Sequence, residues 1–141
     1  METTLKTLLC LIAVVAMVTG INVLIGGAEA VPGASGPVEA TIENELRFFS
    51  VYWVAYGVLC FWVARHLTSQ GAFIPFLLLF FFFGGIARLL STLDIGTPAG
   101  ILLPAMVMEL VLPPVIYVLY VKWRNGRTFA QTTAPDTAVG P

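Results

Sequence analysis

Four long apolar stretches, separated by short polar segments, divide the chain. They cover about residues 5–25, 43–64, 72–92 and 99–122. Each approaches the ~20 residues that an α-helix needs to cross the hydrocarbon core of a bilayer. The pattern predicts an all-α fold in which residues 1–124 form a bundle of four transmembrane helices. Residues 125–141 are polar with several prolines, and they are predicted to form a disordered cytoplasmic tail.

The first apolar stretch also resembles a secretory signal peptide. Lys6 precedes the apolar run, and Ala28 and Ala30 match the spacing of a cleavage site. The run is longer than the ~7–15 apolar residues of a typical signal peptide, and its removal would leave an odd number of spans. The stretch is therefore interpreted as the first transmembrane helix.

Composition supports the membrane class. Apolar residues make up 58% of the chain, charged residues 11%, and the mean hydropathy is +0.92. Soluble domains average roughly 45–50% apolar and 25% charged residues. Little chain remains outside the four stretches, so no soluble catalytic domain is expected.

Basic residues gather on one side of the membrane if the four helices alternate in direction. They are Lys6, Arg65, His66, Lys122, Arg124 and Arg127. Positively charged loops stay in the cytoplasm, so both termini are predicted to be cytoplasmic and the protein to lie in the inner (cytoplasmic) membrane. The opposite loops carry the acidic residues Glu29, Glu39, Glu43, Glu45 and Asp94. The basic residues are interpreted as a topology signal in contact with membrane lipid, and no nucleic acid partner is expected.

Two charged residues lie inside apolar stretches, Arg88 in the third and Glu109 in the fourth. At a rise of ~1.5 Å per residue, Arg88 is expected about 9 Å inside the outer end of its helix and Glu109 about 14 Å inside the next. A lone charge near the bilayer centre costs ~2.5–3.5 kcal/mol or more, so both residues are expected to face inward and to pair. Gly84 and Gly85 lie one turn from Arg88 and would let a neighbouring helix approach closely, although packing alone would also explain them.

Pro113 and Pro114 follow Glu109 by about one turn. Proline has no N–H, so the carbonyl groups of Glu109 and Leu110 lose their helical hydrogen bonds. Arg88 is a suitable partner for a freed carbonyl or for the carboxylate of Glu109, because its guanidinium carries five donors. Alternatively, the prolines only kink the helix, and Glu109 is protonated and bonded to another neighbour.

The second apolar stretch begins with a polar turn. Glu43 and Arg47 are spaced for an ion pair on one helix face, which at a solvated helix end contributes only ~0.3–0.5 kcal/mol. Arg47 is nevertheless expected on the same side of the membrane as Arg88, and unmatched positive charge there would attract an anionic headgroup. We therefore predict an outward-facing, ligand-binding polar pocket lined by Asn22, Glu43, Asn44, Arg47, Arg88 and Glu109.

Two motifs carry a resemblance to a known family. ENELRFFS at residues 43–50 and GGIARLLS at residues 84–91, followed by Gly96 and Pro98, resemble the bacterial four-helix membrane family catalogued as domain of unknown function 4345 (DUF4345). The likeness covers about residues 5–121 and includes the helix spacing. It implies a four-helix membrane domain, broadly similar to the DoxX-like proteins, and it supplies no established activity.

Several chemistries are not expected. The only histidine, His66, falls at a polar hinge, so this chain alone offers no pair of histidine ligands for a haem, and no metal site is predicted. Cys10 and Cys60 are isolated, which does not fit the Cys-x-x-Cys pattern of thiol–disulfide exchange. No catalytic residues and no cofactor are predicted, and an enzymatic role is less expected than a non-enzymatic one.

Three functions remain open at this point. The pocket binds an anionic or polar small molecule, a lipid or a quinone headgroup. Alternatively, the charges lock the bundle, and the aromatic surface at residues 80–83 docks to a larger membrane complex. A third alternative is a small proton-coupled transporter or membrane enzyme subunit in which Glu109 titrates.

Overall fold

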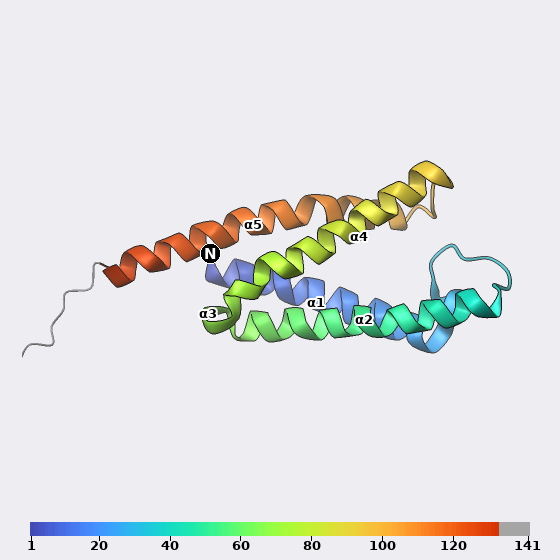
Figure 1. Cartoon of the computed structure of the whole chain (residues 1–141), viewed down its shortest axis with the longest axis horizontal. Coiled ribbons are helices and arrows are strands. Elements are labelled where there is room, and N and C mark those ends of the chain that lie inside the picture. The colour runs from blue at the N-terminus through green and yellow to red at the C-terminus, as the bar shows by residue number, and fades with distance from the viewer. Residues whose placement is uncertain (133–141) are drawn as a thin grey trace, which may run out of the picture.

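A computed structural model describes the backbone of residues 1–132 and the side chains of residues 1–127. Its helices are α1 (Glu2–Gly26), η1 (Gly27–Ala30), α2 (Ala40–Arg65), α3 (Leu67–Gln70), η2 (Gly71–Phe73), α4 (Ile74–Asp94) and α5 (Leu102–Thr132), drawn in Figure 1. The described part of the chain contains no strand. Four helical segments are long and apolar enough to cross a membrane, which confirms the predicted all-α, multi-pass bundle.

The helix boundaries follow local backbone chemistry. α1 ends at Gly26 and is capped by Gly27, whose positive φ of 60° suits a residue without a side chain and whose N–H donates to the carbonyl oxygen of Val23. α4 carries Pro75 in its first turn, where a missing N–H leaves no helical bond unmade. α5 extends to Thr132, so residues 125–132 of the expected tail are helical. The rest of that tail lies outside the described residues.

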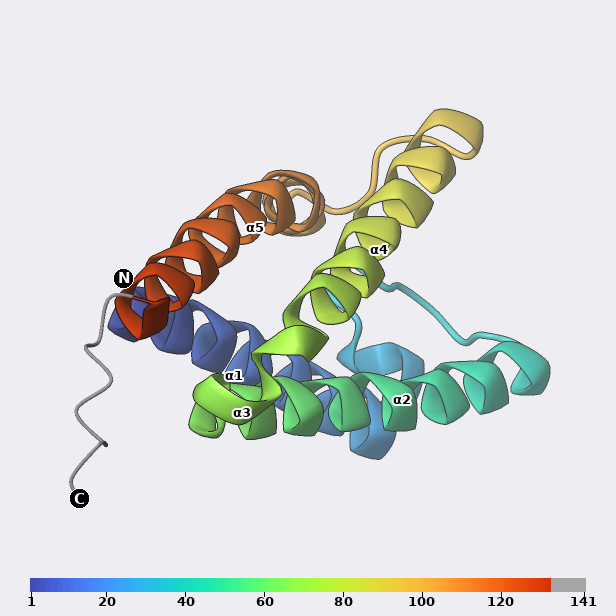
Figure 2. The same ribbon diagram turned by 60° about the vertical axis from the view of Figure 1, so that its left-hand side comes forward.

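The chain folds as two helical hairpins. α1 packs along α2, and α4 packs along α5, whereas contacts between the two hairpins are few (Figures 1 and 2). Glycines bring α1 and α2 close together. A Cβ atom at Gly57 would lie 2.8 Å from the carbonyl oxygen of Ala13, and one at Gly20 would lie 2.7 Å from Cγ2 of Val54. Such small residues are the usual means of tight packing between membrane helices.

The two hairpins share a core at only one end. This terminal end holds Met1, α3 and the second half of α5, and the opposite loop end holds residues 31–39 and 95–101 (Figure 1). All four long helices contribute buried residues to the core, which include Leu9, Cys60, Ile74, Leu77 and Ile116. The α1 residues of this shared core lie between Leu5 and Ala13, in the first half of the helix, and its α5 residues lie after the two prolines. The hairpins are therefore joined at the terminal end.

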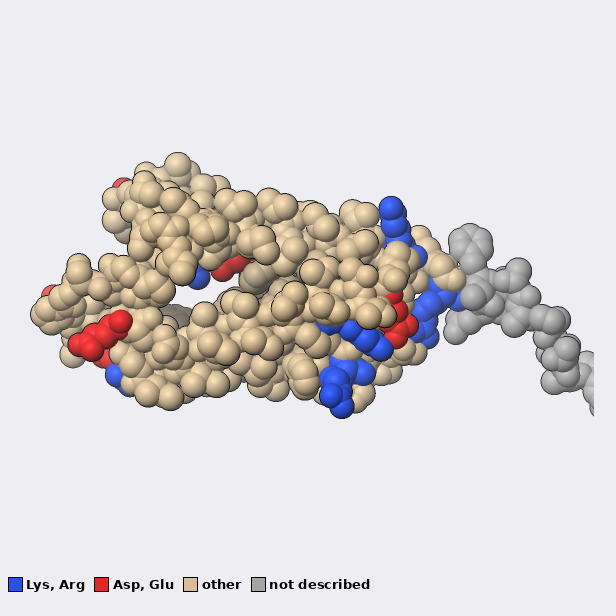
Figure 3. All heavy atoms as spheres, turned by 180° about the vertical axis from the view of Figure 1, so that it is seen from behind, with Lys and Arg blue, Asp and Glu red and all other residues tan. Residues whose placement is uncertain are grey.

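Towards the loop end the hairpins separate. Figure 3 shows an opening between them, with basic and acidic side chains lying together at its edge. Beyond this opening the two loops meet again, because a Cβ atom at Gly33 would collide with Cβ of Ala99. We call this space, bounded by the core on one side and the loops on the other, the opening.

Candidate functional site

An ion pair links α4 to α5 in the loop half of the molecule. Nε of Arg88 donates to both carboxylate oxygens of Glu109, at 2.9 Å to Oε2 and 3.2 Å to Oε1. The Glu109 side chain is 8% exposed and the Arg88 side chain 44%. The predicted pairing of these residues is confirmed, and Arg88 contacts the carboxylate of Glu109.

Close packing of the two helices makes this pair possible. A Cβ atom at Gly85 would lie 2.9 Å from Cγ of Leu110 and 3.0 Å from Cβ of Glu109. Gly84 points into more open space, since its Cβ atom would lie 3.9 Å from Oε2 of Glu109. Gly85 therefore permits the helix contact, and Gly84 leaves room for a small group beside the Glu109 carboxylate.

The terminal amino groups of Arg88 remain available for another partner. Among the hydrogen bonds of residues 1–127, Arg88 donates only through Nε. A small cavity of about 160 Å³ also borders this side chain. The other lining residues come from the end of α4, the following loop and the start of α5: Ser91, Thr92, Gly96, Pro98, Leu102 and Met106. Nε of Arg88 is thus bonded to Glu109, whereas its two terminal nitrogens have no hydrogen-bond partner within residues 1–127.

Pro113 and Pro114 lie inside α5 and do not end it. The axis of α5 changes direction along its length in Figure 2, as expected for a helix that lacks the hydrogen bonds these two residues would donate. Pro113 is buried and Pro114 exposed. The prolines separate the part of α5 that joins the core from the part that carries Glu109.

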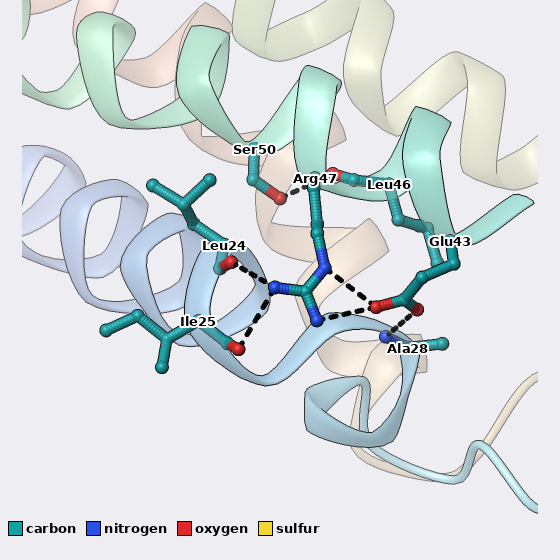
Figure 4. A network of polar contacts seen from close by, with 7 residues as sticks. All are labelled: Leu24, Ile25, Ala28, Glu43, Leu46, Arg47 and Ser50. Carbon is teal, nitrogen blue, oxygen red and sulfur yellow. Dashed lines mark hydrogen bonds and ion pairs between the residues drawn. The ribbon is translucent and has the colours of Figure 1, made fainter. Parts of the chain in front are cut away.

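The second predicted ion pair forms a separate cluster, drawn in Figure 4. Arg47 Nη2 lies 2.7 Å from Oε1 of Glu43, and Arg47 Nη1 donates to the carbonyl oxygens of Leu24 and Ile25 at 2.9 and 3.2 Å. Glu43 Oε2 in turn accepts the N–H of Ala28 at 2.9 Å. The cluster satisfies polar backbone groups at the end of α1 and fastens them to α2.

The six predicted site residues therefore do not form one network. Asn22 donates to the carbonyl oxygen of Ala30 at 3.3 Å, and Asn44 is exposed on α2. No hydrogen bond or ion pair within residues 1–127 joins the Glu43–Arg47 cluster to Arg88 or Glu109. The structure brings together Arg88 with Glu109 and Glu43 with Arg47, and it leaves the two pairs on different hairpins.

Comparison with known proteins identifies the family. Residues 4–120 match the model of a family described as a domain of unknown function, DUF4345. The chain belongs to this family. The match spans the four long helices up to Tyr120 and contains both ion pairs. No curated protein matches the chain, and no solved structure does.

Sequence analysis of this DUF4345 chain missed an aromatic cluster near the ion pair. The rings of Trp53 and Tyr56 on α2 lie 5.2 Å apart with an interplanar angle of 2°, and Phe81 on α4 lies 6.3 and 6.4 Å from them. The seven-residue spacing of Phe81 and Arg88, which puts them on one side of a helix, was the available signal.

Proposed function

We propose that this multi-pass membrane protein binds the polar headgroup of an amphipathic molecule in the opening between its hairpins, with Arg88 as the contacting residue. One observation carries the proposal. A guanidinium in the loop half of a transmembrane hairpin is fixed through Nε by Glu109, and its terminal amino groups have no partner among the described residues. In an apolar environment such donors favour an oxygen-bearing partner.

The ion pair suits this task because it fixes the direction of the donors. An arginine side chain loses rotational freedom when it binds a ligand, and that loss opposes binding. Glu109 already restrains Arg88 before any ligand arrives, so less freedom is lost on binding. A headgroup with carbonyl, phosphate or carboxylate oxygens is an acceptor of suitable geometry.

In this proposal the ligand reaches the opening from within the lipid bilayer. The opening lies between two hairpins that contact each other mainly at the terminal end, so an amphipathic molecule can enter sideways from the lipid. In the proposed orientation, the basic terminal end faces the cytoplasm, and the opening belongs to the outer half of the inner membrane. The Glu43–Arg47 cluster is not needed for this function.

Native mass spectrometry of the protein, extracted gently from its own membrane, tests the proposal. We expect the wild-type protein and an Arg65→Gln control, changed at the terminal end, to retain a small amphipathic molecule. The double variant Arg88→Leu/Glu109→Gln removes both charges together, so no buried charge is left unpaired, and it should lose that molecule.

Equal retention by the double variant and the wild type would contradict the proposal. Co-purification of a protein with the wild type and both variants, without a small molecule, would instead support an accessory subunit of a larger membrane complex.

A further inference from the structure

We infer that the ligand of this site is a neutral, planar ring that bears carbonyl groups and an apolar tail. This inference rests on the proposed function, since it narrows the class of headgroup that Arg88 contacts. Two features of the opening carry it: the balanced charge of the Arg88–Glu109 pair, and the stacked aromatic side chains of Trp53, Tyr56 and Phe81, which we call the aromatic shelf.

The charge balance disfavours an anion. Arg88 already has the Glu109 carboxylate at 2.9 Å, so the pair carries no net charge. An anionic headgroup beside Arg88 would also lie beside Glu109, and the repulsion from the carboxylate would offset much of the attraction to the guanidinium. The cost of removing water from the anion would remain. A neutral carbonyl group accepts the same N–H donors without that repulsion.

The second arginine does not change this balance. Arg47 would supply excess positive charge if it faced the opening alone, but it is paired with Glu43 and bonded to two carbonyl oxygens of α1. Each arginine of the loop half therefore has its own carboxylate. The anionic headgroup expected from the sequence is less favoured than a neutral acceptor.

The aromatic shelf lies where the hairpins begin to separate. Phe81 is the core residue of α4 nearest the loop end, and Trp53 and Tyr56 lie closer to the loop end than every core residue of α2. The shelf joins both hairpins, since two of its rings come from α2 and one from α4. It therefore forms the side of the opening that faces the core.

Hydrogen bonds hold the shelf in place. Nε1 of Trp53 donates to Oγ1 of Thr19 on α1 at 2.8 Å, and the Tyr56 hydroxyl donates to the carbonyl oxygen of Leu77 on α4 at 2.9 Å. Both rings are only partly buried. The orientations of both rings are thus fixed before a ligand binds.

The shelf and the ion pair lie on the same side of α4. Seven residues separate Phe81 from Arg88, which corresponds to about two turns and ~10 Å along the helix. Between them Gly84 has no side chain, and the Glu109 carboxylate faces its open surface. No side chain of α4 therefore stands at Gly84, between the aromatic shelf and the hydrogen-bond donors of Arg88.

A planar carbonyl-bearing ring matches both features. Its carbonyl groups withdraw electrons from the ring, which favours offset stacking on the electron-rich faces of Trp and Tyr. One carbonyl oxygen would accept from the terminal amino groups of Arg88, and an apolar tail would leave through the opening into the lipid. A saturated headgroup gains nothing comparable from the shelf.

Two probes with the same tail separate these classes. A benzoquinone with a decyl chain supplies the neutral ring, and decyl phosphate supplies an anion without a ring. Each is added to the full-length protein in nanodiscs, and two quantities are measured: tryptophan fluorescence and the shift of the thermal unfolding midpoint, which reports ligand affinity. The chain has three tryptophans, so Trp53→Phe identifies the contribution of Trp53 while it preserves an aromatic ring.

We expect the quinone to quench the fluorescence saturably, and the Trp53 component of this quenching to disappear in Trp53→Phe. Trp53→Leu should bind about three- to tenfold more weakly, because it loses the stacking contribution. Decyl phosphate should produce no midpoint shift that depends on Arg88.

The two probes distinguish failure of this inference from failure of the proposed function. If decyl phosphate binds in an Arg88-dependent manner and the quinone does not, the inference is wrong and the proposed function stands. Quenching that rises linearly without saturation, which reports partition into the bilayer, also overturns the inference. If neither probe distinguishes the wild type from Arg88→Leu/Glu109→Gln, the inference and its parent proposal both fail for these headgroups.

Discussion

Arg88 on α4 and Glu109 on α5 form a charge pair in which a single nitrogen, Nε, contacts both carboxylate oxygens at 2.9 and 3.2 Å. The side chain of Glu109 is nearly buried, whereas that of Arg88 is half exposed. Because Glu109 is buried, loss of its partner should destabilise the protein, and the terminal amino groups of Arg88 have no hydrogen-bond partner within residues 1–127.

The first prediction concerns the energetic coupling of this pair. Arg88→Leu leaves the Glu109 carboxylate unpaired, and Arg88→Glu adds a second acid beside it, so the second change should destabilise the protein more. Glu109→Gln in the Arg88→Leu background should recover much of the loss. We expect a coupling free energy of about 1–3 kcal/mol from a double-mutant cycle on unfolding in nanodiscs.

A matched cycle provides the control for that experiment. Arg65 lies at the terminal end, with its guanidinium over the ring of Phe61, so Arg65→Leu and Glu109→Gln should be additive. Additive effects for Arg88 and Glu109 as well would mean that the two side chains do not interact in the membrane.

The second prediction compares two adjacent glycines. Gly85→Ala places a methyl group 2.9 Å from Cγ of Leu110 and 3.0 Å from Cβ of Glu109, so α4 and α5 must move apart. We expect a loss of about 1–3 kcal/mol in the free energy of unfolding. Gly84→Ala meets only Oε2 of Glu109 at 3.9 Å and should be neutral or slightly stabilising, because alanine favours helix.

Thermal unfolding of both variants in the same nanodiscs measures the difference. The prediction is wrong if Gly84→Ala is as destabilising as Gly85→Ala, since backbone conformation and not helix contact would then explain both.

Much of the fold follows from the apolar pattern alone. A span of about 20 apolar residues can only be a helix in lipid, since every backbone polar group needs a partner there. The separation of the hairpins was not predictable in the same way. Lipid tails are as apolar as leucine, so hydrophobicity does not determine which helices pack, and small residues such as Gly20, Gly57 and Gly85 decide it by shape.

In the candidate site, the pairing of buried charges was predictable from the sequence, whereas contacts with backbone groups were not. An isolated charge inside a transmembrane span needs a partner of opposite charge, so the pairing of Arg88 with Glu109 could be predicted from the sequence alone. The contacts of Arg47 were harder to predict from the sequence, because its partners include the carbonyl oxygens of Leu24 and Ile25. Backbone acceptors have no sequence signature, and this pair of carbonyls is free because α1 ends at Gly26, before Gly27 with its positive φ.

The third prediction concerns the cluster that fastens α1 to α2. Arg47→Met removes the donors to the carbonyl oxygens of Leu24 and Ile25 and leaves Glu43 without its cation. Arg47 is 44% exposed, so we expect a moderate loss of about 1–2 kcal/mol. Hydrogen exchange of residues 24–30 should accelerate, while exchange in α4 and α5 stays unchanged. Arg47→Lys should rescue only partly, because an ammonium group cannot reproduce the planar fork of donors.

Glu45→Gln is the matched control, since Glu45 lies on the same turn of α2 and is exposed. Equal acceleration in Glu45→Gln and Arg47→Met would attribute the effect to the acidic helix start and not to the cluster.

The last prediction is the orientation of the protein, which decides the side of the membrane from which the opening is reached. The basic residues of the terminal end predict that the end holding His66 and both termini is cytoplasmic, and that Gly33 and Thr97 lie outside. Single cysteines test this with a membrane-impermeant maleimide on intact cells. Gly33 itself is unsuitable, because its φ is 83° and any side chain would collide with Ala99. Ser35 and Thr97 are exposed loop positions, so Ser35→Cys and Thr97→Cys should react from outside, while Thr68→Cys, two residues after His66, should react only after permeabilisation.

The native cysteines should interfere little with this labelling, since Cys60 is buried in the core and Cys10 packs against it. Reaction of Thr68→Cys from outside would show that the orientation is opposite to the predicted one. The Arg88 donors would then lie in the cytoplasmic half of the bilayer.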